Sequence, residues 1–430
     1  MIALPSFGSS SFKLMAKGLV ELHRLIQEGK DDSPEGESVR DALDTPLHAL
    51  NRTERERAEW LTIDLYSVSD PPAASPLKEM TPPAEQQLDE AYEARQSQDW
   101  DRALKLLRLL QEHLSPAQLS FMRGTIWGDA GYPEVAAFFY EHALETDPTN
   151  ANYLGRYLDA LTEFDPVTAE RLSKQVLAND MNYSPVVVAR AALIHFNHAV
   201  VVVVSASEVA TMCRELIPIL ERNSKRIDNN VSDASRSFGY QMTVQALGYC
   251  YDLLGNSGAA IDSFTRGLLA NPNNHVLLVS RGIQRYGRSS GAITDFEEAE
   301  RLGSTSVWPY FFLAHHCLIT NRFDDCRVMC ERGLRQAGSD AAKSQLEEWR
   351  AISQTALGFP PELVQTAFEA AVQWDPSNES AIRNRQAFEA SKNAPDSRPL
   401  STWEKKSEAA IRQFGIVERR FQSLQPASVG

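Results

Sequence analysis

A spacing of small and aromatic residues that recurs along the chain constrains its fold more than any other feature. The stretch from Leu247 to Asn274 reads LGYCYDLLGNSGAAIDSFTRGLLANPNN, with glycine, tyrosine, alanine and phenylalanine at helical intervals. Proline-containing tetrapeptides at 147–150, 271–274 and 375–378 each follow an amphipathic stretch and signal the end of a helix. Pro272 and Pro376 lie close to three periods of about 34 residues apart. The chain is therefore predicted to repeat one helical hairpin.

The recurring pattern resembles the tetratricopeptide repeat (TPR), whose two antiparallel helices carry small or aromatic residues at fixed signature positions. Small residues let the two helices approach closely, and aromatic rings fill the gaps between adjacent hairpins. The matching residues are Gly124, Trp127, Ala136, Tyr140, Ala143 and Pro148 in one unit, Gly248, Tyr251, Ala260, Phe264, Gly267 and Pro272 in a second, and Phe368, Ala371 and Pro376 in a third. The resemblance implies an all-α, TPR-like α-solenoid in which antiparallel helix pairs form a right-handed superhelix.

The pattern divides the chain into six predicted segments. They are a helical acidic leader at 1–68, a Pro-rich linker at 69–83, the N-terminal half of the array at 84–224, a polar spacer at 225–240, the C-terminal half with a capping helix at 241–391, and a linker with a basic helix at 392–430. The spacer is expected to be a flexible joint between the two halves. The valine run at 200–204 makes one unit irregular and fits either the buried end of a helix or a short strand.

The last segment contains a helix candidate that is basic on an otherwise acidic chain. Ser401 and Glu404 are spaced as a capping box that would start this helix. Its basic side chains are Lys405, Lys406, Arg412, Arg419 and Arg420. They fit either a terminal helix docked against acidic surface of the array or a helix that binds a partner or a membrane surface. The leader and this helix could dock on the array or on each other, and the docked element would then be autoinhibitory.

The charge balance bears on which partners the chain can have. It has 43 Lys+Arg against 57 Asp+Glu, a net charge of −14, and such a field repels phosphate backbones, so no nucleic acid is expected. Five cysteines are too few and too unevenly spread for a disulfide framework, which is compatible with a reducing cytoplasm. Neither a signal peptide nor a transmembrane segment is visible. A cytoplasmic protein is the expectation.

The sequence offers one candidate for metal or redox chemistry. Cys317, Cys326 and Cys330 lie near His315 and His316 in the sequence and could be read as three zinc ligands with a histidine as the fourth. In the repeat register, however, the three cysteines occupy the positions that Tyr251, Ala260 and Phe264 hold in the repeat at 247–274, and free cysteine packs well as a small apolar residue. Core packing is therefore the favoured interpretation, with a metal- or redox-dependent role as the alternative. No phosphate-binding loop, nucleophile elbow or dinucleotide fingerprint is present, so no cofactor and no enzymatic activity are expected.

The resemblance places the functional surface on the first helices of the repeats, which in TPR proteins line a concave groove that holds a peptide or a partner helix. In the present register the groove residues are Tyr249, Asp252, Trp308, Phe311, Phe312, His315, Trp349 and Arg350. Exposed aromatic clusters tend to be binding surfaces. The sequence thus predicts a non-catalytic interaction scaffold or adaptor for a protein or peptide partner, with a self-assembling structural array as an alternative.

Overall fold

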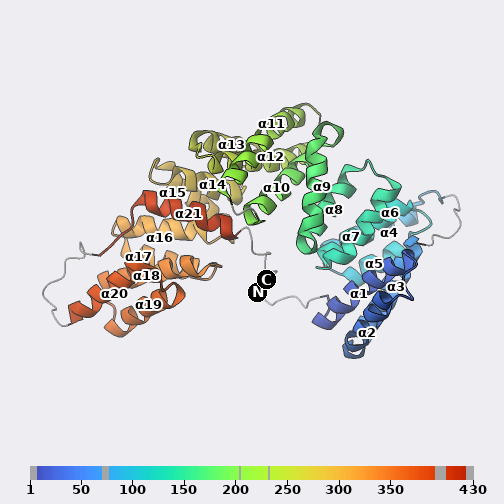
Figure 1. Cartoon of the computed structure of the whole chain (residues 1–430), viewed down its shortest axis with the longest axis horizontal. Coiled ribbons are helices and arrows are strands. Elements are labelled where there is room, and N and C mark those ends of the chain that lie inside the picture. Colours follow the sequence, from blue (N-terminus) through green and yellow to red (C-terminus); the bar gives the residue numbers. More distant parts are fainter. Residues whose placement is uncertain (1–6, 70–76, 203–204, 231–232, 393–402, 423–430) are drawn as a thin grey trace. The chain divides into compact units, whose positions relative to one another are not determined.

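The computed structural model describes residues 7–69, 77–202, 205–230, 233–392 and 403–422. Over these ranges the chain forms helices and no strand, so the prediction of an all-α fold is confirmed. The helices form two compact units, Met1–Ile194 and His195–Gly430 (Figure 1). Each unit is built mainly from pairs of consecutive helices that pack against each other, such as α6 with α7 in the first unit and α12 with α13 and α18 with α19 in the second.

The first unit begins with the leader helices and continues as helical hairpins. Its helices are α1 (Ser10–Gln27), α2 (Pro34–Ala49), α3 (Arg52–Ser69), α4 (Pro82–Gln96), α5 (Trp100–Leu109), α6 (Pro116–Asp129), α7 (Pro133–Thr146), α8 (Ala151–Phe164) and α9 (Pro166–Ala178), with a single 3-10 turn at Asp180–Asn182. Residues 70–76 of the predicted Pro-rich linker lie outside the described part of the chain. The end of that linker belongs to α4, because Thr81 caps the helix and Pro82 occupies its first turn.

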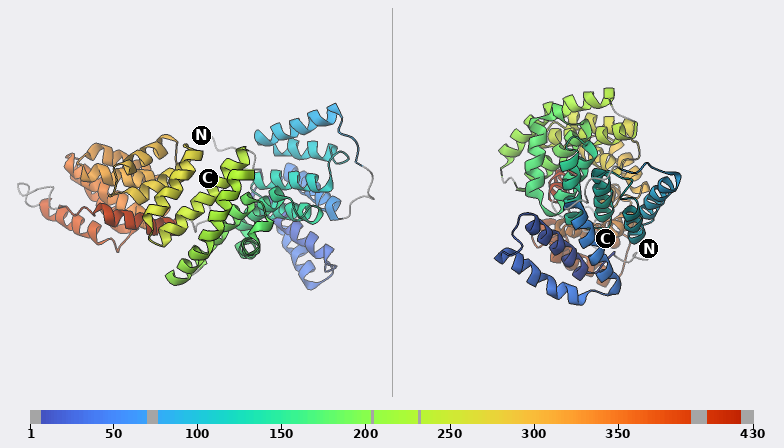
Figure 2. Two further views of the ribbon diagram at one scale, coloured as in Figure 1. Left: turned by 90° about the horizontal axis from the view of Figure 1, so that it is seen from above. Right: turned by 90° about the vertical axis from the view of Figure 1, so that its right-hand side faces the viewer.

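The second unit continues the same arrangement. Its helices are α10 (Pro185–Val202, which begins in the first unit), α11 (Ala206–Asn230), α12 (Asp233–Leu253), α13 (Ser257–Ala270), α14 (His275–Arg285), α15 (Gly291–Arg301), α16 (Trp308–Ile319), α17 (Phe323–Leu334), α18 (Asp340–Ala356), α19 (Pro361–Trp374), α20 (Glu379–Lys392) and α21 (Glu408–Gln422). In Figure 2 (left) the colours of this unit pass from green through yellow to orange along the stack, so that its helices follow one another in chain order. The valine run is helical as far as Val202, and its last two residues are not described.

The proline-containing tetrapeptides end one helix and begin the next. α7, α13 and α19 end directly before them, as the sequence predicts. The last residue of each tetrapeptide then caps the following helix: Asn150 Oδ1 accepts from the amide of Asn152, and Asn274 Oδ1 from that of Val276, both at 3.1 Å. Asn378 Oδ1 accepts from Ala381 N at 3.3 Å. Each asparagine satisfies an amide that the helix itself leaves unpaired.

The signature glycines are explained by close approach of the two helices of a hairpin. A Cβ atom on Gly248 would lie 2.2 Å from Cε1 of Phe264, and one on Gly282 would lie 2.7 Å from Cε1 of Phe296. Gly124 stands in the same relation to Tyr140, at 2.8 Å. A larger residue at these places would push the helices apart. The spacing between glycine and aromatic residue in the sequence therefore corresponds to a direct contact between the two, which recurs in three hairpins.

The predicted polar spacer at 225–240 is largely helical. Residues 225–230 extend α11 and residues 233–240 begin α12. The side chain of Ile227 is fully buried, and Asn223 Nδ2 donates to Thr243 Oγ1 at 3.1 Å, which joins the two helices. Burial of an apolar side chain outweighs the low helix propensity of the surrounding asparagine and serine residues.

The leader docks on the first hairpins rather than standing apart from them. Arg24 on α1 pairs with Glu141 on α7 at 3.1 Å. Asp64 on α3 is buried and binds two arginines of the hairpins, Arg108 at 2.9 Å and Arg123 at 3.0 Å. α3 begins after Asn51, whose side chain and backbone exchange hydrogen bonds with Glu54.

Candidate functional site

The aromatic residues predicted to line a groove come together in the second unit, but they are buried. Trp308, Phe311, Phe312 and His315 all lie on α16, and Trp349 lies on α18. Their exposed fractions are between 0% and 2%. The ring centroids of Phe311 and Trp349 are 4.7 Å apart, and those of His315 and Trp349 are 5.2 Å apart. The cluster is continuous with the hydrophobic core of the unit.

The other three predicted groove residues lie apart from this cluster. Tyr249 on α12 packs against Phe196 and Phe264. Asp252, on the same helix, accepts a hydrogen bond from Gln284 Nε2 at 2.7 Å. Arg350 pairs with Glu347 of its own helix at 2.5 Å. Each of these polar side chains is occupied by a neighbour within the repeats.

The aromatic cluster is covered by residues 403–416, which we call the C-terminal segment. Phe414 stacks on Phe311, with ring centroids 5.3 Å apart and planes inclined by 14°. Gly415 lies against Phe312 so closely that a Cβ atom on the glycine would be 2.5 Å from Cζ of the ring. Ile411 is fully buried. In Figure 1 the helix of this segment, α21 in red, runs alongside α14 and α16, and contacts between α14 and α21 confirm the placement.

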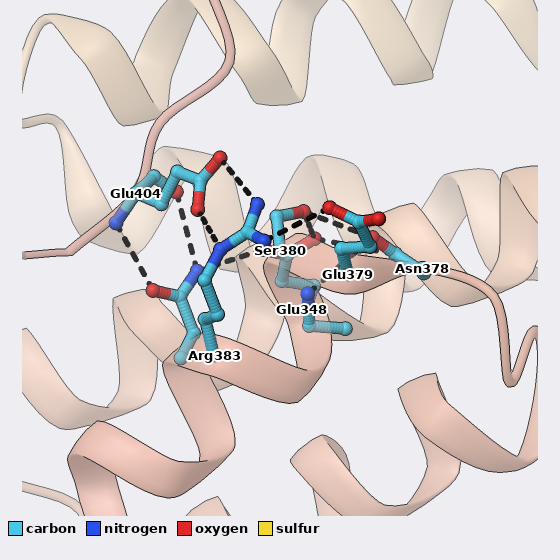
Figure 3. A network of polar contacts seen from close by, with 8 residues as sticks. Glu348, Asn378, Glu379, Ser380, Arg383 and Glu404 are labelled. Carbon is cyan, nitrogen blue, oxygen red and sulfur yellow. Dashed lines mark hydrogen bonds and ion pairs between the residues drawn. The ribbon is translucent and has the colours of Figure 1, made fainter.

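The first part of the C-terminal segment is not helical. Residues 404–407 have no helical structure, and α21 begins at Glu408, where Ser407 Oγ accepts from Ala410 N. The capping box predicted for Ser401 and Glu404 is therefore wrong for Glu404, and Ser401 lies outside the described residues. The reason is tertiary. Glu404 N donates to Asn384 Oδ1 at 3.0 Å, and Asn384 Nδ2 donates to Glu404 O at 3.2 Å, which holds the Glu404 backbone to α20 (Figure 3).

A buried carboxylate supports the asparagine that holds this backbone. Glu348 on α18 is 1% exposed, and its Oε1 accepts from Asn384 Nδ2 at 2.7 Å. Its Oε2 accepts from Gln345 Nε2 at 2.6 Å. The same oxygen accepts from Ser380 Oγ at 2.9 Å, and both Glu348 and Ser380 are labelled in Figure 3. Burial raises the pKa of Glu348 above its ordinary value, although the hydrogen bonds and nearby Lys406 act in the opposite direction. The network joins α18, α20 and the segment.

His315 makes a second contact with the backbone of the segment. Its Nε2 lies 2.8 Å from Lys406 O and must donate to it, so Nδ1, 2.7 Å from Tyr286 Oη, accepts from the tyrosine hydroxyl. Both ring nitrogens are therefore satisfied in the neutral form. Burial is the largest cause that lowers the pKa of His315 from 6.5 to about 4, and His316, Lys405 and Lys406 add to the effect.

The depressed pKa of His315 predicts a loss of stability in acid. Because the neutral form is favoured in the folded protein, its contribution is complete above pH 6.5 and is lost as the pH falls towards 4. Between pH 7 and pH 4.5 the second unit should lose about 2–3 kcal/mol more in the wild type than in a His315→Gln variant, which keeps a donor for Lys406 O but does not titrate. Urea unfolding at the two pH values measures the difference. Equal losses in both proteins would contradict the prediction.

Two consecutive lysines of the segment are bound by different groups. Lys405 Nζ donates to Leu318 O and to Asn321 Oδ1, both at 3.1 Å, at the C-terminal end of α16. A helix C-terminus carries partial negative charge and favours a cation. Lys406 Nζ donates to Gln345 Oε1 at 2.5 Å. Arg412 donates to Tyr286 O. The predicted pairing of the basic helix with acidic surface is thus replaced, at these three positions, by carbonyl and amide oxygens.

Helices α14, α16, α18 and α20 thus form one surface, which we call the segment-binding surface. Its polar contacts come from Tyr286, His315, Gln345 and Asn384, and its apolar floor comes from the rings on α16. Of these, the sequence singled out the α16 rings and His315. Asn384, Gln345, Glu348 and Tyr286 were missed, because a polar residue on a repeat helix carries no motif that marks it as a ligand-binding residue.

The three cysteines of the metal hypothesis are packed in the core. Cys326 and Cys330 are fully buried and Cys317 is 3% exposed. Burial raises the pKa of Cys317 to about 11 and that of Cys330 well above its ordinary value, which disfavours the thiolate that binds metal. In the described part of the chain, no group of three or more His, Cys, Asp or Glu side chains is arranged to hold a metal ion. The packing agrees with the favoured interpretation from the sequence.

Comparisons with known proteins agree with the helical-hairpin architecture. The tetratricopeptide repeat family matches residues 244–274. No curated protein sequence matches the chain. Among the described residues, no helix is both long and apolar enough to span a bilayer.

Three solved structures are similar to the chain at low sequence identity. One is a tetratricopeptide repeat protein from Parabacteroides merdae (13% identity, TM-score 0.33, covering 71% of this chain and 98% of that one). The second is the APC/C hetero-tetramer Cut9–Hcn1 (16% identity, TM-score 0.36, covering 86% of this chain and 68% of that one). The third is a monomeric mutant of IFIT1 with Gppp-AAAA (12% identity, TM-score 0.39, covering 97% of this chain and 95% of that one).

Proposed function

Because the chain is a TPR-like helical repeat protein, we propose that it acts as a non-catalytic scaffold that binds a protein segment on the segment-binding surface. The observation that supports this proposal is the way in which the chain's own C-terminal segment lies there. Asn384 and His315 bond to main-chain atoms of Glu404 and Lys406, which any extended segment would present. Main-chain hydrogen bonds combined with side-chain pockets are a general means of peptide recognition.

The proposal assigns different roles to the residues predicted from the sequence. Trp308, Phe311, Phe312 and His315 contact the C-terminal segment, and Trp349 supports Phe311 and His315 from within the same cluster. Tyr249, Asp252 and Arg350 lie outside the segment-binding surface, so their assignment keeps only the support of the sequence pattern.

The test uses a labelled peptide of residues 401–422 and full-length protein in which Trp403→Ala and Gly415→Leu weaken the protein's own segment. Both substitutions leave the segment-binding surface unchanged. We expect saturable binding in a fluorescence anisotropy titration. Adding Asn384→Ala should weaken it about 10-fold or more, because two main-chain hydrogen bonds of about 0.5–1.5 kcal/mol each are lost.

Arg383→Ala provides the matched control for this experiment. Arg383 lies on the same helix as Asn384 but is exposed and contacts the segment only through the carboxylate of Glu404. An exposed ion pair contributes little, so the affinity should change by less than about fivefold. The melting temperature of each variant reports its folding. Absence of saturable binding, or equal weakening by both substitutions, would contradict the proposed function.

A further inference from the structure

The segment-binding surface holds a lysine of the C-terminal segment at each of two adjacent positions. Lys405 reaches Leu318 O and Asn321 Oδ1 at the C-terminal end of α16, and Lys406 reaches Gln345 Oε1 beside the buried carboxylate of Glu348. The first position offers the negative end of a helix and the second an amide oxygen next to a buried acid. At neither position do these contacts include a positively charged group that could pair with an acidic side chain. A segment that binds here should therefore carry basic residues at both positions.

The apolar contacts add a pattern on either side of the two lysines. Trp403 stacks on Phe368, with ring centroids 5.6 Å apart and planes inclined by 11°. Beyond the lysines, α21 buries Ile411 and Ile416 and stacks Phe414 on Phe311. The C-terminal segment thus combines an aromatic anchor, two basic residues outside the helix, and a helix with one apolar face.

The polar groups that bind the segment would not remain buried without hydrogen-bond partners if the segment dissociated from the surface. Asn384 and His315 bond to backbone atoms of the segment at one end and to groups within the repeats, Glu348 and Tyr286, at the other. On release, the groups that faced the segment would meet water rather than remain buried without a partner, which is the costly case. A segment held in this way can exchange with another of the same chemistry.

We propose that the C-terminal segment is a built-in competitor for a partner protein that presents the same pattern: an aromatic residue, two consecutive basic residues outside any helix, and then an amphipathic helix. This inference rests on the proposed function and names both the partner's chemistry and the regulation of the surface. A tethered competitor acts at an effective concentration on the order of millimolar. The partner therefore binds weakly until the segment is displaced, and the net charge of −14 favours the approach of a basic partner.

The competitor role is tested with the labelled 401–422 peptide and two full-length proteins, the wild type and Gly415→Leu. The substitution places a side chain where a Cβ atom alone would meet Phe312, so it expels the segment without altering the surface. We expect the variant to bind the peptide at least 10-fold more tightly than the wild type. Trp403→Ala, at the opposite end of the segment, should shift the affinity in the same direction. Agreement between the two variants would show that the effect of Gly415→Leu does not come from misfolding.

The dibasic requirement is tested with two peptides of equal net charge. One carries Lys405→Gln and Lys406→Gln, and the other carries Ala409→Glu and Gln413→Glu at exposed positions of α21. The first should bind at least 10-fold more weakly than the unaltered peptide, and the second less than about threefold more weakly, because only the first removes cations from their bound positions.

The possible outcomes separate the inference from the proposed function. Binding of the peptide to all proteins with equal affinity would overturn the competitor role while leaving the proposed function intact. Equal losses for the two altered peptides would overturn the dibasic requirement. A wild-type dimer that becomes monomeric on Gly415→Leu substitution, measured by light scattering, would show that the segment occupies a second copy and would also overturn the inference. Absence of binding to every protein would contradict both proposals.

Discussion

Replacement of Asp64 by alanine is expected to lower the free energy of unfolding of the first unit by about 3–5 kcal/mol. The carboxylate is 1% exposed and binds Arg108 through two hydrogen bonds of 3.1 and 2.9 Å. Its Oδ1 also lies 3.0 Å from the guanidinium of Arg123, which is 2% exposed. Removing the acid would leave a buried arginine without its counter-charge, which costs more than the loss of the pair itself.

Urea unfolding and hydrogen-exchange mass spectrometry of the full-length protein measure this effect, since exchange reports the two units separately. Glu112→Ala is the matched control in the same unit, because the pair of Glu112 with Lys78 is exposed on both sides. It should cost less than about 1 kcal/mol. An Asp64→Ala variant as stable as the control would mean that the leader is not held to the hairpins through this residue.

Replacement of Phe312 by alanine is expected to destabilise the second unit by about 3–5 kcal/mol. The ring is fully buried and stacks on Phe296, with centroids 4.8 Å apart, and it lies 4.9 Å from the ring of Tyr286. It also supports Gly415 of the C-terminal segment. The deletion leaves a cavity at a junction of two hairpins and the segment, where little can collapse to fill it.

Hydrogen-exchange protection of α14, α16 and α21 should all fall in this variant, whereas the first unit should keep its protection. Leu363→Ala on α19 serves as control, because its side chain is 52% exposed and little apolar contact is lost. Unchanged protection in α16 would place Phe312 outside the core. The expected result also means that loss of binding in a Phe312→Ala protein reports damage to the core, and Asn384→Ala is the sharper probe of the surface.

Much of the repeat architecture could be predicted because it depends on local spacing. Asn150, Asn274 and Asn378 cap helices within three residues of themselves. The contact between Gly248 and Phe264 lies within a single hairpin. Such contacts recur at a fixed separation, so the periodicity of the sequence records them directly.

The site was predicted less completely. The sequence placed aromatic residues on α16 and raised docking of the C-terminal helix as one of two interpretations, but exposure of the rings could not be inferred from it. Periodicity alone assigns an apolar ring to a face, and a face can meet solvent, a neighbouring hairpin or a distant segment. No sequence motif marked Asn384 or Glu348 as a site residue, because their hydrogen-bond partners lie in distant parts of the sequence and are known only from the folded structure.

By itself the sequence determined that the chain forms helical hairpins, where α7, α13 and α19 end, and which small residues face which rings, since all of these depend on residues close together in the chain. Only the tertiary structure decided that residues 404–407 are not helical, that α21 begins at Glu408, and that the aromatic cluster is covered. His315 bonds to a residue 91 positions away and Asn384 to one 20 positions away. Such contacts follow from burial and hydrogen bonding between distant segments, which no local spacing encodes.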